Sequence, residues 1–389
     1  MRRALALAIL TLAACGGDDA GGTWLGDTRV LVQGVGTDEQ DCTTAICPHN
    51  ENTDLLRVGD AIYLVHRTAQ SQILGPNSSL LVYRSDDGGK TFTRLARILA
   101  PQPPGSADLP GADGRDLRDP SLFVVDGKLT IKAITRLPHM STRDSDVDSI
   151  SVGITSPDGG ATWGPLTPLG PVGWSFWRVV EHGGRYYSAA YQDGDLQVKL
   201  FSSDDGVHWL MGPTVYDVSA DTPLETELVF MPSGRLLALV RMDGTDDELL
   251  GNAGRLRTQV CWAEPPYDRF DCPQTLDGER LDGPVAFWHD GRLFVVARKH
   301  LPDFDRKRTN LFELGGNLDG GPLTITDLGS FPSAGDTAYA GYADVDADHG
   351  LVTWYSSDLG DDRAWLFAIL DPSDIWQGTI DFTRLPAPP

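Results

Sequence analysis

The chain has few basic residues, few cysteines and, beyond its first residues, no long hydrophobic run. Lysine and arginine number 32 against 55 aspartates and glutamates, which gives a formal net charge of −23. Such a surface repels phosphate backbones, so nucleic acid is excluded as a partner. No run beyond the leader reaches the ~20 apolar residues of a transmembrane helix, and helical periodicity is nowhere sustained. Glycine (43) and proline (26) are abundant and dispersed, which is typical of many short strands joined by turns.

The first residues have the pattern of an export signal. Arg2 and Arg3 precede the apolar residues 4–12, and small residues precede Cys15. This predicts a secretory signal over residues 1–14, too short to span a membrane. Residues 12–15 (Leu-Ala-Ala-Cys) resemble the lipobox of bacterial lipoproteins, in which the cysteine is acylated. We prefer this to an ordinary signal with an incidental cysteine, and expect a lipid at Cys15, a tether over 15–22, and anchoring in the bacterial outer membrane or at the cell surface. Without Arg2 and Arg3 the net charge moves from −23 to about −25.

Four cysteines remain, and an even number in an exported protein predicts two disulfides. Three connectivities are possible, of which the local pairs Cys42–Cys47 and Cys261–Cys272 are favoured. Zinc is the alternative, but no CxxC motif or nearby histidine pair supports it. The acidic residues 144–148 lack a complete calcium-loop signature, so a solvated loop is favoured over a Ca²⁺ site. We therefore expect no metal and no cofactor.

One unit recurs six times along the chain. It has a polar start, an apolar pair, a turn with glycine and a dense apolar strand, as expected of a β-hairpin. The copies span residues 54–67, 119–136, 177–191, 225–241, 283–298 and 339–355. Their spacing leaves room for two more strands in each unit. The sequence therefore predicts an all-β fold, a monomeric six-bladed β-propeller of four-stranded antiparallel blades over residues 23–389. The strand expected within 23–33 should close the ring by pairing near 364–370.

A second motif follows the hairpins of three units. Residues 85–92, 156–163 and 202–209 each read S-x-D-x-G-x-x-(W/F). In these loops we expect serine and aspartate to accept bonds from backbone amides, and the aromatic residue to fill the gap between strands. The motif resembles the Asp-box, or BNR repeat, of the sialidase superfamily. That resemblance implies a structural role away from the active site.

The first strand of each propeller unit surrounds the central channel, so the polar starts of the repeats are the candidates for ligand binding. Each taken singly is more often a structural hydrogen bond or ion pair, but their recurrence at one position of six units is informative. Around the ring they are Asp54, Arg118 with Asp119, Arg178, Glu225 or Glu227, Asp282 and Tyr339, with Arg298 added as a further substrate-binding candidate.

The second half of the chain resembles the sialidase superfamily in its motifs. Glu225 and Glu227 before a strand that leads to Arg241 resemble the segment with the family's glutamate and second arginine. Arg308 in R-x-x-L resembles its third arginine, and Tyr339 in Thr-Ala-Tyr resembles its nucleophile. The separations of 67 residues from Arg241 to Arg308 and 31 from Arg308 to Tyr339 are similar to the family's.

The resemblance implies a specific chemistry. Tyr339 is the nucleophile, Glu227 or Glu225 is its base, and arginines pair with an acidic sugar. A neutral tyrosine avoids the repulsion between a carboxylate nucleophile and the carboxylate of sialic acid.

The first half departs from that pattern. The place of the family's first arginine reads Glu51-Asn52-Thr53, and the loop expected to hold an acid/base aspartate, residues 71–77, has no acid. Asp119 in Arg118-Asp119-Pro120, or Asp54, are the alternatives for that role.

Two functions follow. The favoured one is an exo-acting glycosidase of a terminal sugar, acidic sugars included. The alternative is a non-catalytic surface propeller that binds a glycan or a protein.

Overall fold

The computed structural model describes most of the chain beyond its first residues. The described residues are 22–36, 40–73, 75, 78–99, 115–136, 149–192, 197–217, 221–244, 256–301, 306–357 and 359–387. Cys15, the predicted signal, nearly all of the predicted tether and the acidic residues 144–148 lie outside them.

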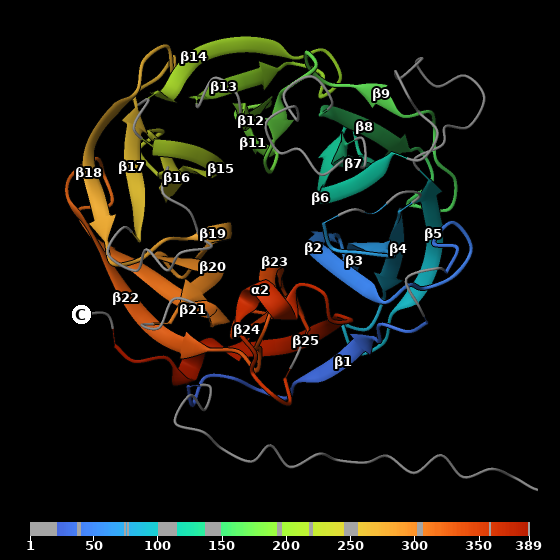
Figure 1. Ribbon diagram of the computed structural model, residues 1–389. Helices are drawn as coiled ribbons and strands as arrows, with labels where there is room; N and C mark the ends of the chain where they lie inside the picture. Colours follow the sequence, from blue (N-terminus) through green and yellow to red (C-terminus); the bar gives the residue numbers. More distant parts are fainter. Residues whose placement is uncertain are drawn as a thin grey trace, which may run out of the picture.

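The strands that the structure describes form six antiparallel sheets arranged radially around a central axis (Figure 1). This confirms the six-bladed propeller. From the axis outward, blade 1 has β2 (His49–Val58), β3 (Ala61–Ala69), β4 (Ser79–Ser85) and β5 (Thr93–Leu99), and blade 2 has β6 (Asp116–Val125), β7 (Lys128–Arg136), β8 (Ile150–Ser156) and β9 (Thr167–Pro168).

Blade 3 differs because its innermost strand is split into β10 (Ser175–Phe176) and β11 (Val180–His182). Both pieces pair with β12 (Arg185–Gln192). The blade continues outward with β13 (Gln197–Ser203) and β14 (Leu210–Asp217).

The last three blades are regular. Blade 4 has β15 (Asp221–Phe230), β16 (Leu236–Gly244), β17 (Arg257–Ala263) and β18 (Asp271–Asp277). Blade 5 has β19 (Asp282–His289), β20 (Arg292–His300), β21 (Lys307–Gly316) and β22 (Leu323–Ser330). Blade 6 has β23 (Thr337–Asp344), β24 (His349–Ser356), β25 (Asp374–Asp381) and, from the other end of the chain, β1 (Arg29–Val32).

The ring closes where β1 pairs with β25, with Arg29 opposite Gln377. A closing N-terminal strand was predicted, but its predicted partner was wrong. Residues 364–370 contain the short helix α2 (Trp365–Ala368), and the pairing strand follows at Asp374. A short apolar run does not distinguish helix from strand, which explains the error.

Turn residues with positive φ join the two inner strands of blades 1 to 5, as predicted, whereas none of residues 348–350 in blade 6 has positive φ. Asp126 and Gly127 have φ of 48° and 73°, and Asp290 and Gly291 have 46° and 73°. Two consecutive positive φ values match the right-handed twist of a hairpin.

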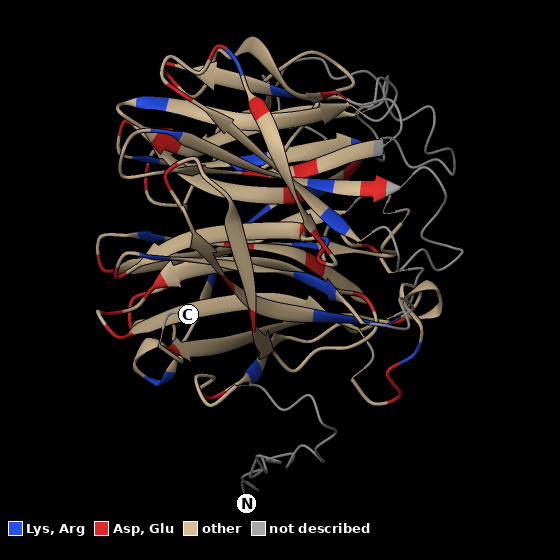
Figure 2. Cartoon of the chain, turned by 90° about the vertical axis from the view of Figure 1, so that its left-hand side faces the viewer, with Lys and Arg blue, Asp and Glu red and all other residues tan. Residues whose placement is uncertain are grey.

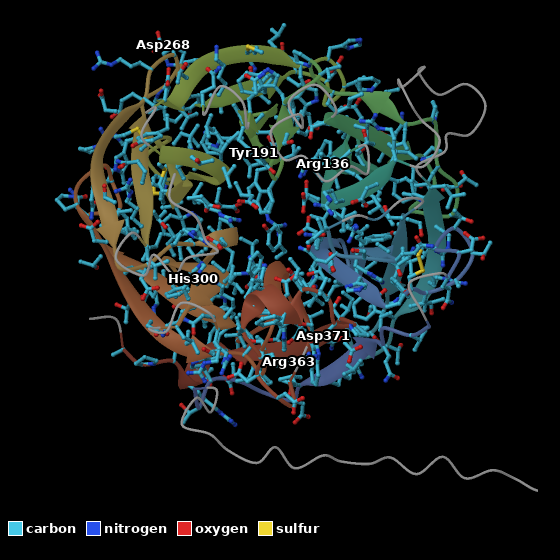
Figure 3. All side chains as sticks on the ribbon, viewed as in Figure 1. Arg136, Tyr191, Asp268, His300, Arg363 and Asp371 are labelled. Atoms are coloured by element: carbon cyan, nitrogen blue, oxygen red, sulfur yellow. A yellow bond between two sulfur atoms is a disulfide. The ribbon has the colours of Figure 1, made fainter. Side chains whose placement is uncertain are left out.

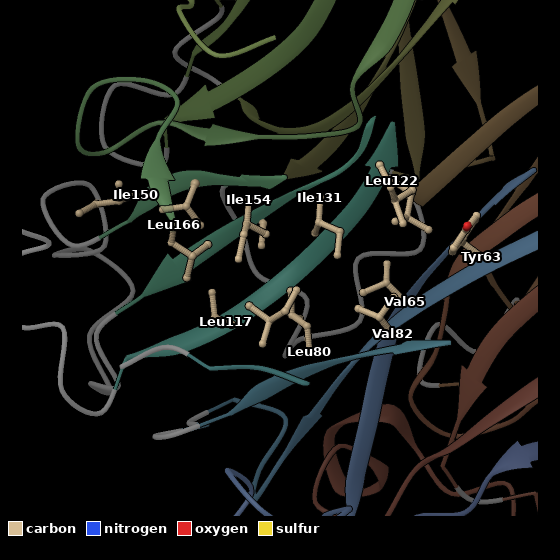
Figure 4. Packing of buried hydrophobic residues seen from close by; sticks show 14 of the residues in the cluster. Tyr63, Val65, Leu80, Val82, Leu117, Leu122, Ile131, Ile150, Ile154 and Leu166 are labelled. Carbon is tan, nitrogen blue, oxygen red and sulfur yellow. The ribbon is translucent and has the colours of Figure 1, made fainter. Parts of the chain in front are cut away.

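The core lies between the blades rather than within one of them. β3 is buried along its whole length because it packs against neighbours on both faces. Figure 4 shows the cluster between blades 1 and 2, where Val65, Leu80 and Val82 meet Leu117 and Ile131. Contiguous apolar strands therefore fix the inner elements, and the polar groups of the inner strands are left to face the axis.

The three serine–aspartate loops join the third and fourth strands of blades 1 to 3. In the first loop, Ser85 Oγ accepts from Gly89 N at 2.9 Å and Asp87 accepts from Thr91 N at 2.9 Å. The second loop repeats these contacts from Ser156 and Asp158.

The third loop differs from its predicted alignment. Ser203 and Asp205 bond each other there, and Asp205 accepts from Val207 N and His208 N. The residues expected in these roles were Ser202 and Asp204, and Asp204 instead pairs with Arg185 at 3.0 Å. This loop is one residue shorter between serine and tryptophan, so the spacing of the motif misassigned it.

Both predicted disulfides are present, Cys42–Cys47 before β2 and Cys261–Cys272 between β17 and β18. No helix of the described residues is long and apolar enough to cross a membrane. Within the same residues, no group of three or more His, Cys, Asp or Glu side chains is arranged to hold a metal ion. Figure 2 shows charged residues of both signs at strand ends and turns on both faces of the disc.

Candidate active site

Register shifts in the innermost strands turn side chains toward the central axis. They occur between Glu51 and Asp54, Arg118 and Ser121, Pro223 and Thr226, Asp282 and Val285, and Ala338 and Gly341. In four of them the first extra residue has positive φ, at Asn52 (49°), Asp119 (47°), Gly283 (56°) and Tyr339 (47°). Positive φ strains non-glycine residues, and such strain is concentrated at functional sites.

The bulges of blades 1, 2, 4 and 6 open onto a pocket of about 160 Å³. Its walls come from blades 1 to 4 and blade 6. The lining residues are Glu51, Asn52, Gln72, Arg118, Asp119, Arg136, Tyr191, Leu224, Glu225 and Tyr339. In the view along the axis, the labelled side chains of Arg136 and Tyr191 lie close to the central opening (Figure 3).

Tyr339 and Glu225 meet across this pocket. The Tyr339 hydroxyl donates a short hydrogen bond to Oε1 of Glu225, a residue of blade 4 that is 114 positions away in sequence. Arg241 donates to the same phenol oxygen at 3.2 Å and to both oxygens of Glu225 at 2.9 and 3.0 Å. A phenol is thus held between a base and a cation.

Burial changes the pKa of both members of the pair. It raises the pKa of Glu225 above its ordinary value, while the neighbouring Arg241 opposes the rise. Burial also raises the pKa of Tyr339 well above its ordinary range, and the charge of Glu225 adds to this. Glu225 is therefore a stronger base than an exposed glutamate, and Tyr339 stays a neutral phenol until its proton is taken.

The ring of Tyr339 is fixed on several sides. A Cβ added to Gly283 would lie 2.8 Å from Cγ and Cδ2 of the ring, so glycine is required there for close approach. Trp177 contacts the ring edge to face at 5.7 Å, and the Arg298 guanidinium lies 5.3 Å from its centroid. The Thr53 hydroxyl lies 3.1 Å from the Tyr339 carbonyl oxygen. The strained residue is therefore preorganised.

Arg241 is held in turn by acids behind the pocket. Its guanidinium contacts Asp243 at 2.7 Å and Asp282 at 3.3 Å. Burial opposes its charge, but the nearby carboxylates raise its pKa well above the ordinary value. The pKa of Asp282 is held well below its ordinary value against burial, chiefly by Arg241 and Arg280. Behind Asp282, His300 donates to it at 2.9 Å, and burial lowers the pKa of His300 to about 3.

A group of polar side chains spans the central channel and links blades 1, 3, 4 and 6. Arg178 pairs with Asp54 and donates to the carbonyl of Ala340 on the opposite side of the ring. Trp177 donates to Glu227 at 3.0 Å. We call Trp177, Arg178, Asp54 and Glu227 the channel plug.

Two carboxylates of the channel plug also join neighbouring blades. Asp54 accepts from Leu122 N at 2.7 Å and Glu227 from Ala286 N at 3.0 Å. Burial raises the pKa of Glu227 to about 7.

Lys132 borders the channel plug and supports Asp119. Its ammonium donates to the Asp119 carbonyl at 2.7 Å and to the Phe176 carbonyl at 2.8 Å. Burial lowers the pKa of Lys132 to about 7. The contact holds the bulge that presents Asp119 to the pocket.

The wall from blades 1 and 2 contains its own ion-pair cluster. Arg67 bonds Glu51 at 2.7 Å and Asp116 at 2.9 Å, and Arg118 bonds Asp116 at 2.8 Å. Asp119 lies on this wall, facing the same pocket as Tyr339, and is partly buried.

The predicted site residues therefore separate into groups. The structure brings Tyr339, Glu225, Asp119 and Arg118 to one pocket. Arg241 contacts both Tyr339 and Glu225, and Arg298 lies against the Tyr339 ring. It places Asp54, Arg178 and Glu227 in the channel plug, so Glu225 and not Glu227 contacts the tyrosine.

Arg308 is held apart from the pocket. It forms a bidentate pair with Asp362 at 2.8 and 2.7 Å.

The sequence-based reasoning missed the pocket-lining residues Glu51, Asn52, Gln72, Arg136, Tyr191 and Leu224. Asn52 had a usable signal, because asparagine just before a repeat is one of the few side chains that tolerate positive φ. No motif marks the others.

No protein-family model and no curated protein matches this chain. Solved structures do resemble it. The NanB sialidase of Streptococcus pneumoniae aligns with a TM-score of 0.63 and 13% identity over 91% of this chain and 71% of that one. A Penicillium chrysogenum α-L-arabinanase, solved with arabinobiose, aligns with a TM-score of 0.60 and 12% identity over 93% and 99%. A Dyadobacter fermentans protein of unknown function aligns with a TM-score of 0.62 and 17% identity over 91% and 99%. The chain thus shares its propeller fold with glycoside hydrolases.

Proposed function

We propose that this protein is an exo-acting glycoside hydrolase in which Tyr339 is the nucleophile and Glu225 its base. The observation that carries the proposal is the hydrogen bond from the Tyr339 hydroxyl to the buried Glu225 carboxylate, with Arg241 3.2 Å from the same oxygen. A nucleophile, its base and a charge stabiliser in mutual contact are the signature of covalent catalysis.

The shape of the pocket supports action at a chain end. A volume of about 160 Å³ corresponds to roughly five water molecules at ~30 Å³ each, enough for one sugar ring. The channel plug spans the axis beside the pocket, with Trp177 against the Tyr339 ring. We expect a glycan to enter from the open side, with its terminal residue first.

Each step can be written with its protons. Tyr339 Oη attacks the anomeric carbon while its proton passes to Glu225. The glycosidic bond breaks, and the leaving oxygen takes a proton from the carboxyl group of Asp119. A water molecule then adds to the anomeric carbon and gives its proton to Asp119. The bond to Tyr339 breaks, and the phenolate takes its proton back from Glu225.

Arg241 stabilises the intermediate charges. It lies against the phenol oxygen, so it favours the phenolate in the attacking and leaving stages. Asp119 is assigned the acid/base role because it faces the same pocket as Tyr339, whereas Asp54 is engaged by Arg178 in the channel plug.

The test is Tyr339→Phe, with Tyr342→Phe as the matched control. Tyr342 lies on the same strand, and its hydroxyl donates to Asp344 rather than into the pocket. Turnover of aryl glycosides should fall by at least about 1,000-fold in the first variant and change little in the second. An activated fluorosugar should leave a covalent mass increment on the Tyr339 peptide of the native protein. Equal turnover in Tyr339→Phe would reject the nucleophile. Sugar binding without turnover of any glycoside would favour a non-catalytic glycan-binding propeller.

We also propose that the chain works at the bacterial cell envelope, tethered by a lipid on Cys15. The support is the leader sequence, together with two disulfides of the kind that persist in oxidising compartments. Cys15→Ser should move the protein from the membrane fraction to the soluble fraction of the envelope. Continued membrane association of the variant would contradict the lipid anchor.

A further inference from the structure

We infer that the sugar accepted in this pocket is neutral, and that acidic sugars such as uronic and sialic acids are disfavoured. The inference rests on the proposed function and names the substrate class of the same site. It departs from the expectation of arginine clamps for an acidic sugar.

Each arginine that the sequence singled out as a clamp already has a carboxylate partner within the protein. Arg118 pairs with Asp116, Arg178 with Asp54, Arg241 with Glu225, Arg298 with Asp336, and Arg308 with Asp362. Most of these partners are buried, with side-chain exposures from 2% to 7% for the first four and 26% for Asp362.

Recruiting one of these arginines would be costly. A guanidinium binds a substrate carboxylate best through two parallel hydrogen bonds. If it turned to the substrate, the protein carboxylate would lose a buried partner, which is strongly destabilising. Asp116 would keep a second arginine, Arg67. The loss of the buried pair offsets the gain from the new one, so these arginines do not form an acid-binding clamp.

Carboxyl groups outnumber cations on the pocket lining. Glu51, Asp119 and Glu225 contribute three carboxyl groups, against the two cations Arg118 and Arg136. Glu51 is paired with Arg67, Glu225 with Arg241 and Arg118 with Asp116, and Arg136 has an interaction of its own. A sugar carboxylate entering this pocket therefore meets guanidinium groups that are already engaged.

The net charge of the whole protein also disfavours acidic sugars. A formal net charge of −23 lowers the local concentration of anionic glycans near the surface. The tyrosine nucleophile is compatible with a neutral sugar as well, because its proton goes to Glu225 irrespective of the charge on the sugar. The polar lining residues Asn52, Gln72 and Tyr191 suit hydroxyl groups, and a tyrosine ring offers an apolar face to a sugar ring.

The experiment measures binding of matched neutral and acidic monosaccharides to the native protein. The pairs are glucose with glucuronic acid and galactose with galacturonic acid, joined by arabinose, xylose and N-acetylneuraminic acid. Affinities come from saturation-transfer NMR or calorimetry at physiological salt, and 4-nitrophenyl glycosides of the same sugars report turnover.

We expect at least one neutral sugar to bind at least tenfold more tightly than any acid. An acid that binds as tightly as the best neutral sugar, or the absence of binding by every sugar, overturns the inference. The two proposals fail separately. Neutral binding without turnover of any glycoside removes the catalytic role of Tyr339 and leaves the substrate class. Turnover of acidic glycosides removes the neutral substrate class and leaves the catalytic role of Tyr339.

A pair of variants tests the arginine argument directly. Asp116→Asn removes a carboxylate partner of Arg118, which lines the pocket, and should raise affinity for a uronic acid about tenfold. Asp362→Asn removes the carboxylate partner of Arg308, which does not line the pocket, and should leave that affinity unchanged. If Asp116→Asn does not fold, Glu51→Gln should give the same direction of change, since it removes a carboxylate from the lining. Unchanged affinity in the folded variants contradicts the inference.

Discussion

The pocket wall from blades 4 and 6 and the wall from blades 1 and 2 use their charges differently. On the first, Glu225 and Arg241 of blade 4 converge with Tyr339 of blade 6 on a single oxygen atom. On the second, Glu51, Arg67, Asp116 and Arg118 neutralise one another, and Asp119 faces the pocket from a strained bulge. The first wall holds a reactive group, whereas the second presents one carboxyl group beside a neutralised cluster.

The comparison teaches that the role of a polar residue near the axis depends on where it lies relative to the bulge of its strand. Residues at the bulges reach the pocket, as Asp119 and Tyr339 do. Asp54 and Glu227, which follow the bulges, instead join blades. Glu51 and Arg118, which precede them, line the pocket but are held in ion pairs. The predictions below test this division.

The largest effect is expected for the two glutamates of β15. Glu225→Gln removes the base of Tyr339 and should lower kcat by about 100- to 10,000-fold. Glu227→Gln should change kcat by less than about tenfold, because Glu227 bonds Trp177 and Ala286 rather than the tyrosine. Steady-state kinetics on an aryl glycoside measure both. Losses of equal size would abolish the distinction between a bulge position and a plug position.

The two aspartates of the first two blades form the next pair. Asp119→Asn removes the acid/base group and should lower kcat about 100-fold. Asp54→Asn breaks a buried pair with Arg178 and should reduce stability by about 3–5 kcal/mol with a smaller change in kcat. Kinetics and urea denaturation separate the two. The assignment is reversed if Asp54→Asn alone loses turnover while folded.

Two glycines of blade 5 test the fixation of Tyr339. Gly283 and Gly291 both have positive φ, 56° and 73°, so alanine costs about 1–2 kcal/mol of strain at either. Only at Gly283 does the added Cβ overlap the Tyr339 ring, and Gly291 faces open space. Gly283→Ala should therefore cost about 1–3 kcal/mol more and also lower kcat about tenfold or more. If the two variants have the same kcat, the ring does not depend on this contact.

The smallest effect concerns the pH dependence of stability. Burial raises the pKa of Glu227 to about 7, above the value of 4.5 in the unfolded chain. The folded protein thus keeps a proton that the unfolded chain releases, so the free energy of unfolding decreases as pH rises from about 4.5 to 7. Glu227→Gln should remove up to about 3 kcal/mol of this decrease.

Urea denaturation at pH 5 and pH 7.5 measures that difference between native and variant proteins. The free energy of unfolding of Asp54→Asn, another substitution in the channel plug, is measured at the same two pH values for comparison. Parallel pH profiles for native protein and Glu227→Gln would show that Glu227 does not keep this proton.

Much of the fold could be predicted because its signals are local. Asp126-Gly127 and Asp290-Gly291 favour positive φ by residue type, and the apolar strands beside them have no alternative but burial. The two short disulfides follow from cysteine spacing for the same reason. The partner of β1 could not be predicted, because residues 364–370 are apolar without a period that separates helix from strand.

The site could be predicted only in part. Tyr339, Glu225 and Arg241 are all named by sequence motifs, but Glu225 and Glu227 are two residues apart and lie on one face of an ideal strand. A bulge between Pro223 and Thr226 separates their surroundings, and a bulge leaves no clear mark in this sequence.

What the sequence by itself determined is the repeating unit, the turns, the disulfide pairs and the kinds of side chain that face the axis, since each depends on residues close together along the chain. The tertiary structure decided which of those side chains meet. Glu225 and Tyr339 are 114 residues apart, and Arg308 finds Asp362 across 54. The physical reason is that closure of the ring and the register of each inner strand set these distances, and both depend on contacts between blades.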